Sequence, residues 1–340
     1  STTSTLHVMN TDTNTLWGTV SVPAASGSGR DVVMAPDQSL AFVADYYAGA
    51  VWVVDLNAMA LAAGTNPITL TGYYGGAGDL DVTADGRFLV ANSYGSTRVV
   101  NVATRSVVST LGAGYSVVAG SDGTVLVTEP GSSTRPVRRF ELDERGNLRD
   151  TGQSLFLSGS YNANNVVLAP DNRTGVMLNA YGTLQTFLVS GMAAVESRNL
   201  SAPVSGVFSP SGDRFYVRTY GGTLSAWAYD PATARLGSTA LYSVPLGNAG
   251  NYPEVERLDI SADGSQLCVT DNTAVKVYDA ASGNFLTSFS NAAHTYVGID
   301  LPPQYTPAPS RGVYLDSATS MVHVVDTATD FSFHGVMTAF

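Results

Sequence analysis

TADGRFLVAN, residues 83–92, contains the pattern that decides the fold: a tight turn, Ala84-Asp85-Gly86, leads into an apolar strand over residues 88–91. Asp and Gly favour tight turns, and β-branched and aromatic residues favour strands. Versions of this turn recur near residues 36, 84, 121, 170, 210, 262 and 303, at intervals of 37 to 52 residues that average about 44. A four-stranded propeller blade has this length, so the repeat predicts an all-β propeller.

Each repeat can be divided into four strands, which we name a, b, c and d in chain order. In the first full repeat, strand a covers residues 31–34, strand b residues 40–44 and strand c residues 50–54. Strand c commonly ends in Asp or Asn, as at Asp230 and Asp279, and such residues favour an Asx-turn into strand d. We therefore predict a single domain, residues 1–340, built as seven four-stranded antiparallel blades.

The N-terminal residues 1–22 do not fit this count. They contain two further strand-like segments, residues 6–10 and 16–22, separated by residues 10–14, which mimic the start of a calcium loop. That loop lacks the central Gly and distal Glu of a calcium site, so a simple turn is favoured. We expect the hairpin to help close the ring. An eighth, two-stranded blade is the alternative, although two strands alone are only marginally stable.

Composition excludes several classes of function. Only 13% of the residues are charged and 44% are hydrophobic, which predicts a large packed core rather than disorder. The 17 basic and 28 acidic residues give a net charge of −11, so we expect no nucleic-acid partner. Four histidines and one cysteine, Cys268, are too few for most metal clusters or a disulfide, and we predict no metal and no cofactor.

The same composition suggests a location. The chain is rich in Ser, Thr, Gly and Asn and begins at Ser1 rather than Met, which is typical of a mature or trimmed secreted chain. No run of 18 apolar residues occurs, so a membrane span is not expected. We therefore predict an extracellular, periplasmic or cell-surface protein, either a monomer or part of a larger surface assembly.

Three strings resemble a known repeat. Residues 42–45 (FVAD), 89–92 (LVAN) and 6–15 (LHVMNTDTNT) are similar to the YVTN repeat, and the similarity extends over nearly the whole chain. Residues 140–148 also resemble the lactonase-type seven-bladed propellers. Both resemblances imply a seven-bladed propeller. Neither implies a particular reaction, because no histidine-bearing lactonase motif is found that would allow catalytic residues to be transferred.

The predicted topology separates two ends of the blades. Strand direction alternates, so a–b and c–d turns share one end, and b–c and d–a loops share the other, which we name the b–c end. The turns need their Pro, Asp and Gly, whereas the b–c end carries polar and aromatic residues that turns do not require. The candidate ligand-binding residues at the b–c end are Arg30, Asp45, Tyr46, Asn92, Tyr94, Tyr115, Glu129, Asn165, Asn179, Tyr181, Arg218, Tyr220, Arg257, Asp271 and Tyr296.

Two interpretations of these residues stay open. They can be loop formers whose tyrosines cap the packing between blades, or they can bind a ligand around a central opening. We favour a binding or interaction scaffold that recognises a glycan, peptide or protein partner. The alternative is a lactonase-like hydrolase of a small lactone or ester. Its candidate catalytic residues would be His294, Glu256, Arg30, Arg218 and Arg257.

One stretch, residues 135–150, concentrates charge of both signs. We expect it to form strand c and an outer hairpin whose opposite charges pair across strands.

Overall fold

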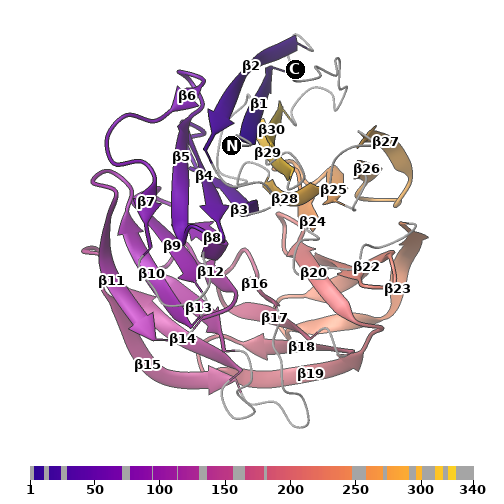
Figure 1. The fold of residues 1–340 in the computed structure, drawn as a ribbon. Helices are drawn as coiled ribbons and strands as arrows, with labels where there is room; N and C mark the ends of the chain where they lie inside the picture. Colours follow the sequence, from indigo (N-terminus) through magenta and orange to yellow (C-terminus); the bar gives the residue numbers. More distant parts are fainter. Residues whose placement is uncertain are drawn as a thin grey trace. The chain divides into compact units, whose positions relative to one another are not determined.

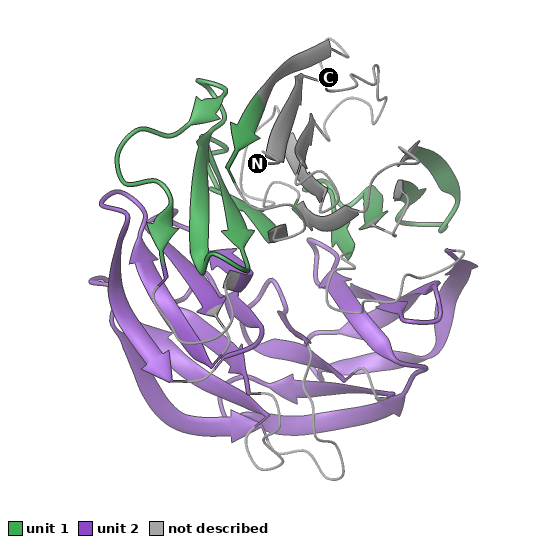
Figure 2. Cartoon of the chain, in the orientation of Figure 1, with its two compact units in different colours: residues 1–69, 255–340 green, residues 70–254 purple. Residues whose placement is uncertain are grey.

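The computed structural model describes these parts of the chain: residues 4–10, 15–23, 29–70, 77–93, 95–112, 114–129, 136–155, 165–179, 182–246, 258–270, 274–290, 296–300, 311–316 and 321–326. Strands dominate throughout, and no described helix is long and apolar enough to cross a membrane. The chain divides into two compact units, residues 1–69 with 255–340 and residues 70–254 (Figure 2).

Unit 2, residues 70–254, contains four sheets, each built from four strands in antiparallel chain order (Figure 1). The first comprises β8 (Ala77–Val82), β9 (Phe88–Ser93), β10 (Ser96–Asn101) and β11 (Ser106–Gly112). The second comprises β12 (Val117–Ala119), β13 (Thr124–Thr128), β14 (Val137–Leu142) and β15 (Leu148–Leu155). The third comprises β16 (Asn165–Leu168), β17 (Thr174–Asn179), β18 (Thr183–Leu188) and β19 (Ala193–Asn199), and the fourth β20 (Pro203–Phe208), β21 (Arg214–Thr219), β22 (Thr223–Asp230) and β23 (Arg235–Pro245).

Unit 1 contains two further sheets of the same kind. One comprises β3 (Gly29–Met34), β4 (Leu40–Asp45), β5 (Ala50–Asp55) and β6 (Ala60–Leu61), with the short β7 (Ile68–Thr69) also paired to β5. The other comprises β24 (Leu258–Ile260), β25 (Gln266–Thr270), β26 (Ala274–Asp279) and β27 (Phe285–Ser290). The predicted order of strands a to d is confirmed in all six of these sheets, counting both units.

The remaining sheet of unit 1 differs from the predicted seven four-stranded antiparallel blades. Its order is β2-β1-β30-β29-β28, where β28 is Tyr296–Asp300, β29 Arg311–Asp316, β30 Met321–Asp326, β1 Ser4–Asn10 and β2 Thr15–Val22. It therefore has five strands, and β1 runs parallel to β30. No short loop links β1 to β30, so the antiparallel direction that a hairpin imposes is not required there.

The repeated Asp residues hold the turns. In the a–b turns, the carboxylate oxygens of Asp37, Asp85 and Asp263 each accept the backbone N–H two residues later, at 3.0 Å. At the c–d turns, Asp230 accepts from Ala232 N at 3.0 Å and Asp279 from Ser282 N at 2.7 Å. The predicted Asx-turns are thus confirmed, and these acidic residues have a structural purpose.

Carboxylates also join neighbouring sheets in unit 2. Strands β8 and β12 each lie at the edge of their sheet, so part of their backbone lacks a ladder partner. Asp79 Oδ2, on β8, accepts the backbone N–H of Val117 at 2.7 Å, and Asp81 Oδ2 accepts that of Ala119 at 2.7 Å. The same arrangement occurs within unit 1, where Asp300 Oδ2 accepts from Met34 N at 2.8 Å.

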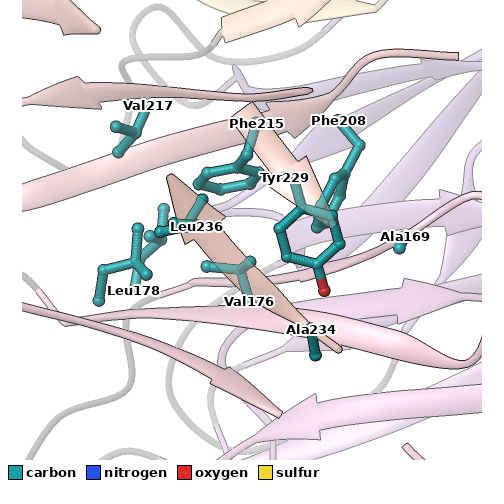
Figure 3. Packing of buried hydrophobic residues seen from close by; sticks show 10 residues of the cluster. Ala169, Val176, Leu178, Phe208, Phe215, Val217, Tyr229, Ala234 and Leu236 are labelled. Atoms are coloured by element: carbon teal, nitrogen blue, oxygen red, sulfur yellow. The ribbon is translucent and has the colours of Figure 1, made fainter. Parts of the chain in front are cut away.

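Apolar side chains fill the space between sheets. Between the third and fourth sheets of unit 2, Phe208 packs against Phe215 and Tyr229 with ring centroids 4.8 and 4.9 Å apart (Figure 3). Val176 and Leu178 of β17 complete the same buried cluster. The space between these two sheets is therefore filled by apolar side chains, in keeping with the low content of charged residues.

Replacing Asp79 tests the carboxylate link between β8 and β12. Asp79→Ala leaves the buried N–H of Val117 without its acceptor, and we expect a loss of about 2 kcal/mol in the free energy of unfolding. Asp79→Asn retains one acceptor oxygen and should lose less. Urea denaturation measures both, and hydrogen exchange should accelerate at the Val117 amide. Unchanged exchange at that amide would contradict the proposed role of the carboxylate.

Because of Tyr229, we expect the free energy of unfolding to depend on pH in the alkaline range. Burial raises the pKa of Tyr229 to about 12 from 10, and the charges of Asp171 and Asp230 act in the same direction. The folded state therefore keeps a proton that the unfolded state releases, so stability is complete below pH 10 and falls as the pH rises from 10 to 12. Tyr229→Phe should reduce this fall by up to about 3 kcal/mol. Identical pH profiles of the two proteins in urea denaturation would contradict this account.

Candidate functional site at the b–c end

In unit 2, three predicted site residues lie at the end of strand b and are buried. Asn92 on β9 is 1% exposed, Asn179 on β17 is 1% exposed, and Arg218 on β21 is 0% exposed. Asn165, at the start of strand a in the third sheet, is half-buried. The b–c end of this unit therefore has a band of buried amide and guanidinium groups.

The best-defined part of this band surrounds Asn92. Its Oδ1 accepts a hydrogen bond from Thr97 Oγ1 at 2.5 Å, while its Nδ2 is buried and has no hydrogen-bond partner among the residues that the structure describes. Gly114, with a φ of +147°, lies so close that a Cβ there would stand 2.4 Å from Thr97 Oγ1 and 2.6 Å from Asn92 Oδ1. Only glycine fits this approach between the first and second sheets.

Glu129, one of the predicted ligand-binding residues, takes part in an ion-pair network. Its Oε1 forms an ion pair with Arg138 Nη1 at 2.6 Å, and Arg138 also pairs with Asp150. Arg149 likewise pairs with Glu141 on the neighbouring strand. The expected cross-strand pairing of residues 135–150 is confirmed, and Glu129 belongs to this network.

In unit 1, Asp45 anchors the turn between β4 and β5. The side chain is 1% exposed, its Oδ1 accepts from Ala48 N at 3.1 Å, and its Oδ2 accepts from Trp52 Nε1 at 3.2 Å. Gly49 completes the turn with a φ of +60°. Asp45 is thus a structural residue that holds the loop in one shape.

The tyrosines divide by exposure. Tyr47 is 70% exposed and forms an edge-to-face pair with the half-buried Tyr46, with ring centroids 5.4 Å apart. Tyr220, on the β21–β22 turn, is 39% exposed, and its backbone N–H donates to Ala202 O. Tyr115 is half-buried beside Gly114. Tyr47 and Tyr220 therefore present much of their rings to solvent instead of capping the packing of blades.

Several predicted residues cannot be placed. The side chains of Arg30 and Tyr296 are not described, although their backbones lie in β3 and β28. The following lie wholly outside the described residues: Tyr94, Tyr181, Arg257, Asp271, Glu256 and His294. Of the candidate catalytic residues, only Arg218 has a described side chain, and it is fully buried.

Three residues that shape these sites were not predicted from the sequence. Thr97 and Trp52 belong to strand c, where their spacing suggested only ordinary strand residues, and Gly114 resembled any loop glycine. Their roles depend on which residues of neighbouring strands face them, which no local signal encodes. Among the described side chains, no group of three or more His, Cys, Asp or Glu is placed to hold a metal ion.

Comparisons with solved structures identify the class of fold. Hydrazine synthase of Kuenenia stuttgartiensis is 15% identical, with a TM-score of 0.71 over 90% of this chain and 97% of that one. A functionally unknown protein of Desulfotomaculum acetoxidans is 18% identical, with a TM-score of 0.68 over 85% and 95%. The β-propeller domain of Cps50 (Swd1) from Myceliophteria thermophila is 12% identical, with a TM-score of 0.69 over 89% and 98%.

The chain is therefore an all-β propeller of four-stranded antiparallel blades, as the repeat predicted. Identities this low show the fold alone. No family model matches the sequence, and no curated protein does so either.

Gly114→Ala tests the close approach at Asn92. Alanine there would combine an unfavourable backbone conformation with a Cβ at 2.4 Å from Thr97 Oγ1, and we expect a loss of at least about 2 kcal/mol in the free energy of unfolding. Gly112→Ala is the matched control, because nothing lies within 4 Å of its added Cβ and its φ is not positive. Equal stability of the two variants in urea denaturation would show that the contact is not tight.

Proposed function

We propose that the protein is a binding scaffold that recognises a partner through loops at the b–c end of its blades. The observation that supports this most strongly is the exposure of Tyr47, at 70%, on a turn that is fixed by two hydrogen bonds to the buried Asp45. An aromatic ring packed between blades would be buried. A rigid, exposed ring instead supplies contact area at little conformational cost, as tyrosines do in recognition loops.

The carboxylates favour the same conclusion. A hydrolase needs an acid or base free to exchange a proton with its substrate. Both oxygens of Asp45 accept structural hydrogen bonds, and Glu129 pairs with Arg138. These two predicted site carboxylates are therefore engaged in holding the fold, which supports a binding role for the part of the b–c end that the structure describes.

We further propose that both units belong to one seven-bladed domain of the YVTN or lactonase-like kind, secreted or displayed at a cell surface. The seventh blade would be the sheet in which β1 pairs with β30, because this pairing joins the two ends of the chain. The regular repeat and the Ser, Thr and Gly content support the proposal. The protein would act alone or as part of a larger surface assembly.

A ligand screen tests the binding role. Thermal shifts would be recorded with panels of glycans, peptides and lactones, first for the wild-type protein and then for Tyr47→Ala. We expect at least one glycan or peptide to raise the melting temperature, and Tyr47→Ala to abolish that rise. Leu241→Ala is the control, since Leu241 is a comparably exposed residue, 51%, on the separate strand β23.

The hydrolase alternative predicts a different result. Turnover of a lactone or ester that disappears in Arg218→Ala, without any ligand whose binding depends on Tyr47, would overturn the scaffold in favour of a hydrolase.

A further inference from the structure

The β4–β5 turn combines two tyrosine rings with a buried carboxylate, a combination that the proposed binding role does not by itself explain. Its tip, residues 46–49, consists of two tyrosines, Ala48 and Gly49, and carries no charged side chain. The two rings stand edge to face, 79° apart in plane, and Tyr47 is largely open to solvent. The faces of aromatic rings are electronegative, so they attract cations.

A buried carboxylate lies directly before this tip. Asp45 is 1% exposed, and its hydrogen-bond donors among the described residues are neutral: the amide of Ala48 and the indole of Trp52. No cationic side chain among those the structure describes forms an ion pair with it. Neutral dipoles orient a buried carboxylate but leave its net charge in place, and a low-dielectric surrounding screens that charge less than water does.

The chain as a whole adds to this field. Its net charge of −11 would raise the local concentration of a cationic partner and repel an anionic one. A neutral sugar could stack on Tyr47, but it would gain nothing from Asp45 or from the overall charge. Guanidinium groups suit such a place, because they are planar, weakly hydrated and stack on aromatic faces.

We propose that the β4–β5 turn binds an arginine or lysine side chain of a basic peptide segment, with the cation over Tyr47 and within the field of Asp45. This inference rests on the proposed binding role and names the partner chemistry for one of its loops. Arginine is expected to bind more tightly than lysine, because its planar group stacks as well as carrying charge.

The test uses two fluorescent peptides that differ only in charge: one with arginine between glycines, and one with citrulline, its neutral isostere, at the same positions. Fluorescence anisotropy would measure binding to the full chain. We expect the arginine peptide to bind more tightly than the citrulline peptide. Tyr47→Leu should weaken arginine-peptide binding roughly five-fold, while Tyr47→Phe, which retains the ring, should leave it unchanged.

A control variant separates the turn from general attraction to an acidic protein. Phe285→Leu alters another exposed aromatic residue, 56%, which lies on β27 outside the candidate ligand-binding residues and also has an edge-to-face partner, Tyr278; this variant should bind the arginine peptide like the wild type. Equal binding of arginine and citrulline peptides would overturn the cation preference. Arginine binding that is unaffected by Tyr47→Leu would overturn the site, because net charge alone would then explain it.

The outcomes also separate this inference from the proposed function. A neutral glycan whose binding requires Tyr47, together with no preference for arginine, would overturn the cationic partner and leave the scaffold role standing. The cationic partner and the scaffold role would both be overturned only if the binding of no ligand in the panels depended on Tyr47. Circular dichroism and the melting temperature of each variant would show that the altered binding does not come from unfolding.

Discussion

The interaction on which the rest depends is a hydrogen bond between adjacent sheets, in which a backbone N–H of an edge strand donates to a carboxylate on the edge strand of the next sheet. An edge strand has only one neighbouring strand in its sheet, so part of its buried backbone needs hydrogen-bond acceptors and donors from elsewhere. Asp79 and Asp81 supply acceptors to β12, and Asp300 supplies one to β3 within its own unit. Apolar packing alone is non-directional, whereas these bonds fix the register of one sheet against the next.

This constraint gives many of the acidic residues a structural role. In a chain with few charges, each carboxylate invites a functional interpretation. Here many of them close turns, as Asp85 and Asp230 do, or link sheets, as Asp79 does. Hydrogen bonds from Thr233 and from the Ala232 amide accordingly hold the pKa of Asp230 below its usual value. The structural hydrogen bonds and ion pairs of a carboxylate therefore have to be identified before it is considered for catalysis. Both oxygens of Asp45 accept structural hydrogen bonds, and Glu129 is paired with Arg138.

The fold could be predicted because its signals are local. Ala84-Asp85-Gly86 and the strand after it encode a turn and a hairpin within about ten residues, and the period gives the blade. The parallel pairing of β1 with β30 could not be predicted, because it joins opposite ends of the chain without a loop to constrain its direction. The candidate site residues were chosen by residue type and end of blade, which do not reveal burial: Asn92 and Arg218 are buried, and Gly114 could be recognised only from its backbone angle and close contacts.

Two tyrosines show how differently the same residue type can be placed, one buried in packing and one exposed on the turn of the proposed binding site. Tyr229 lies in a buried aromatic cluster, where burial raises its pKa and its ring packs against Phe208. Tyr47 has one edge-to-face contact and an otherwise open ring. Since burying such a ring is worth a few kcal/mol, an exposed one forgoes stability that the fold could have gained. The turn beneath Tyr47 nevertheless devotes a buried carboxylate and an indole to holding it in place. A rigid support under an unpacked aromatic ring is expected of a surface that stabilises a partner rather than the fold itself.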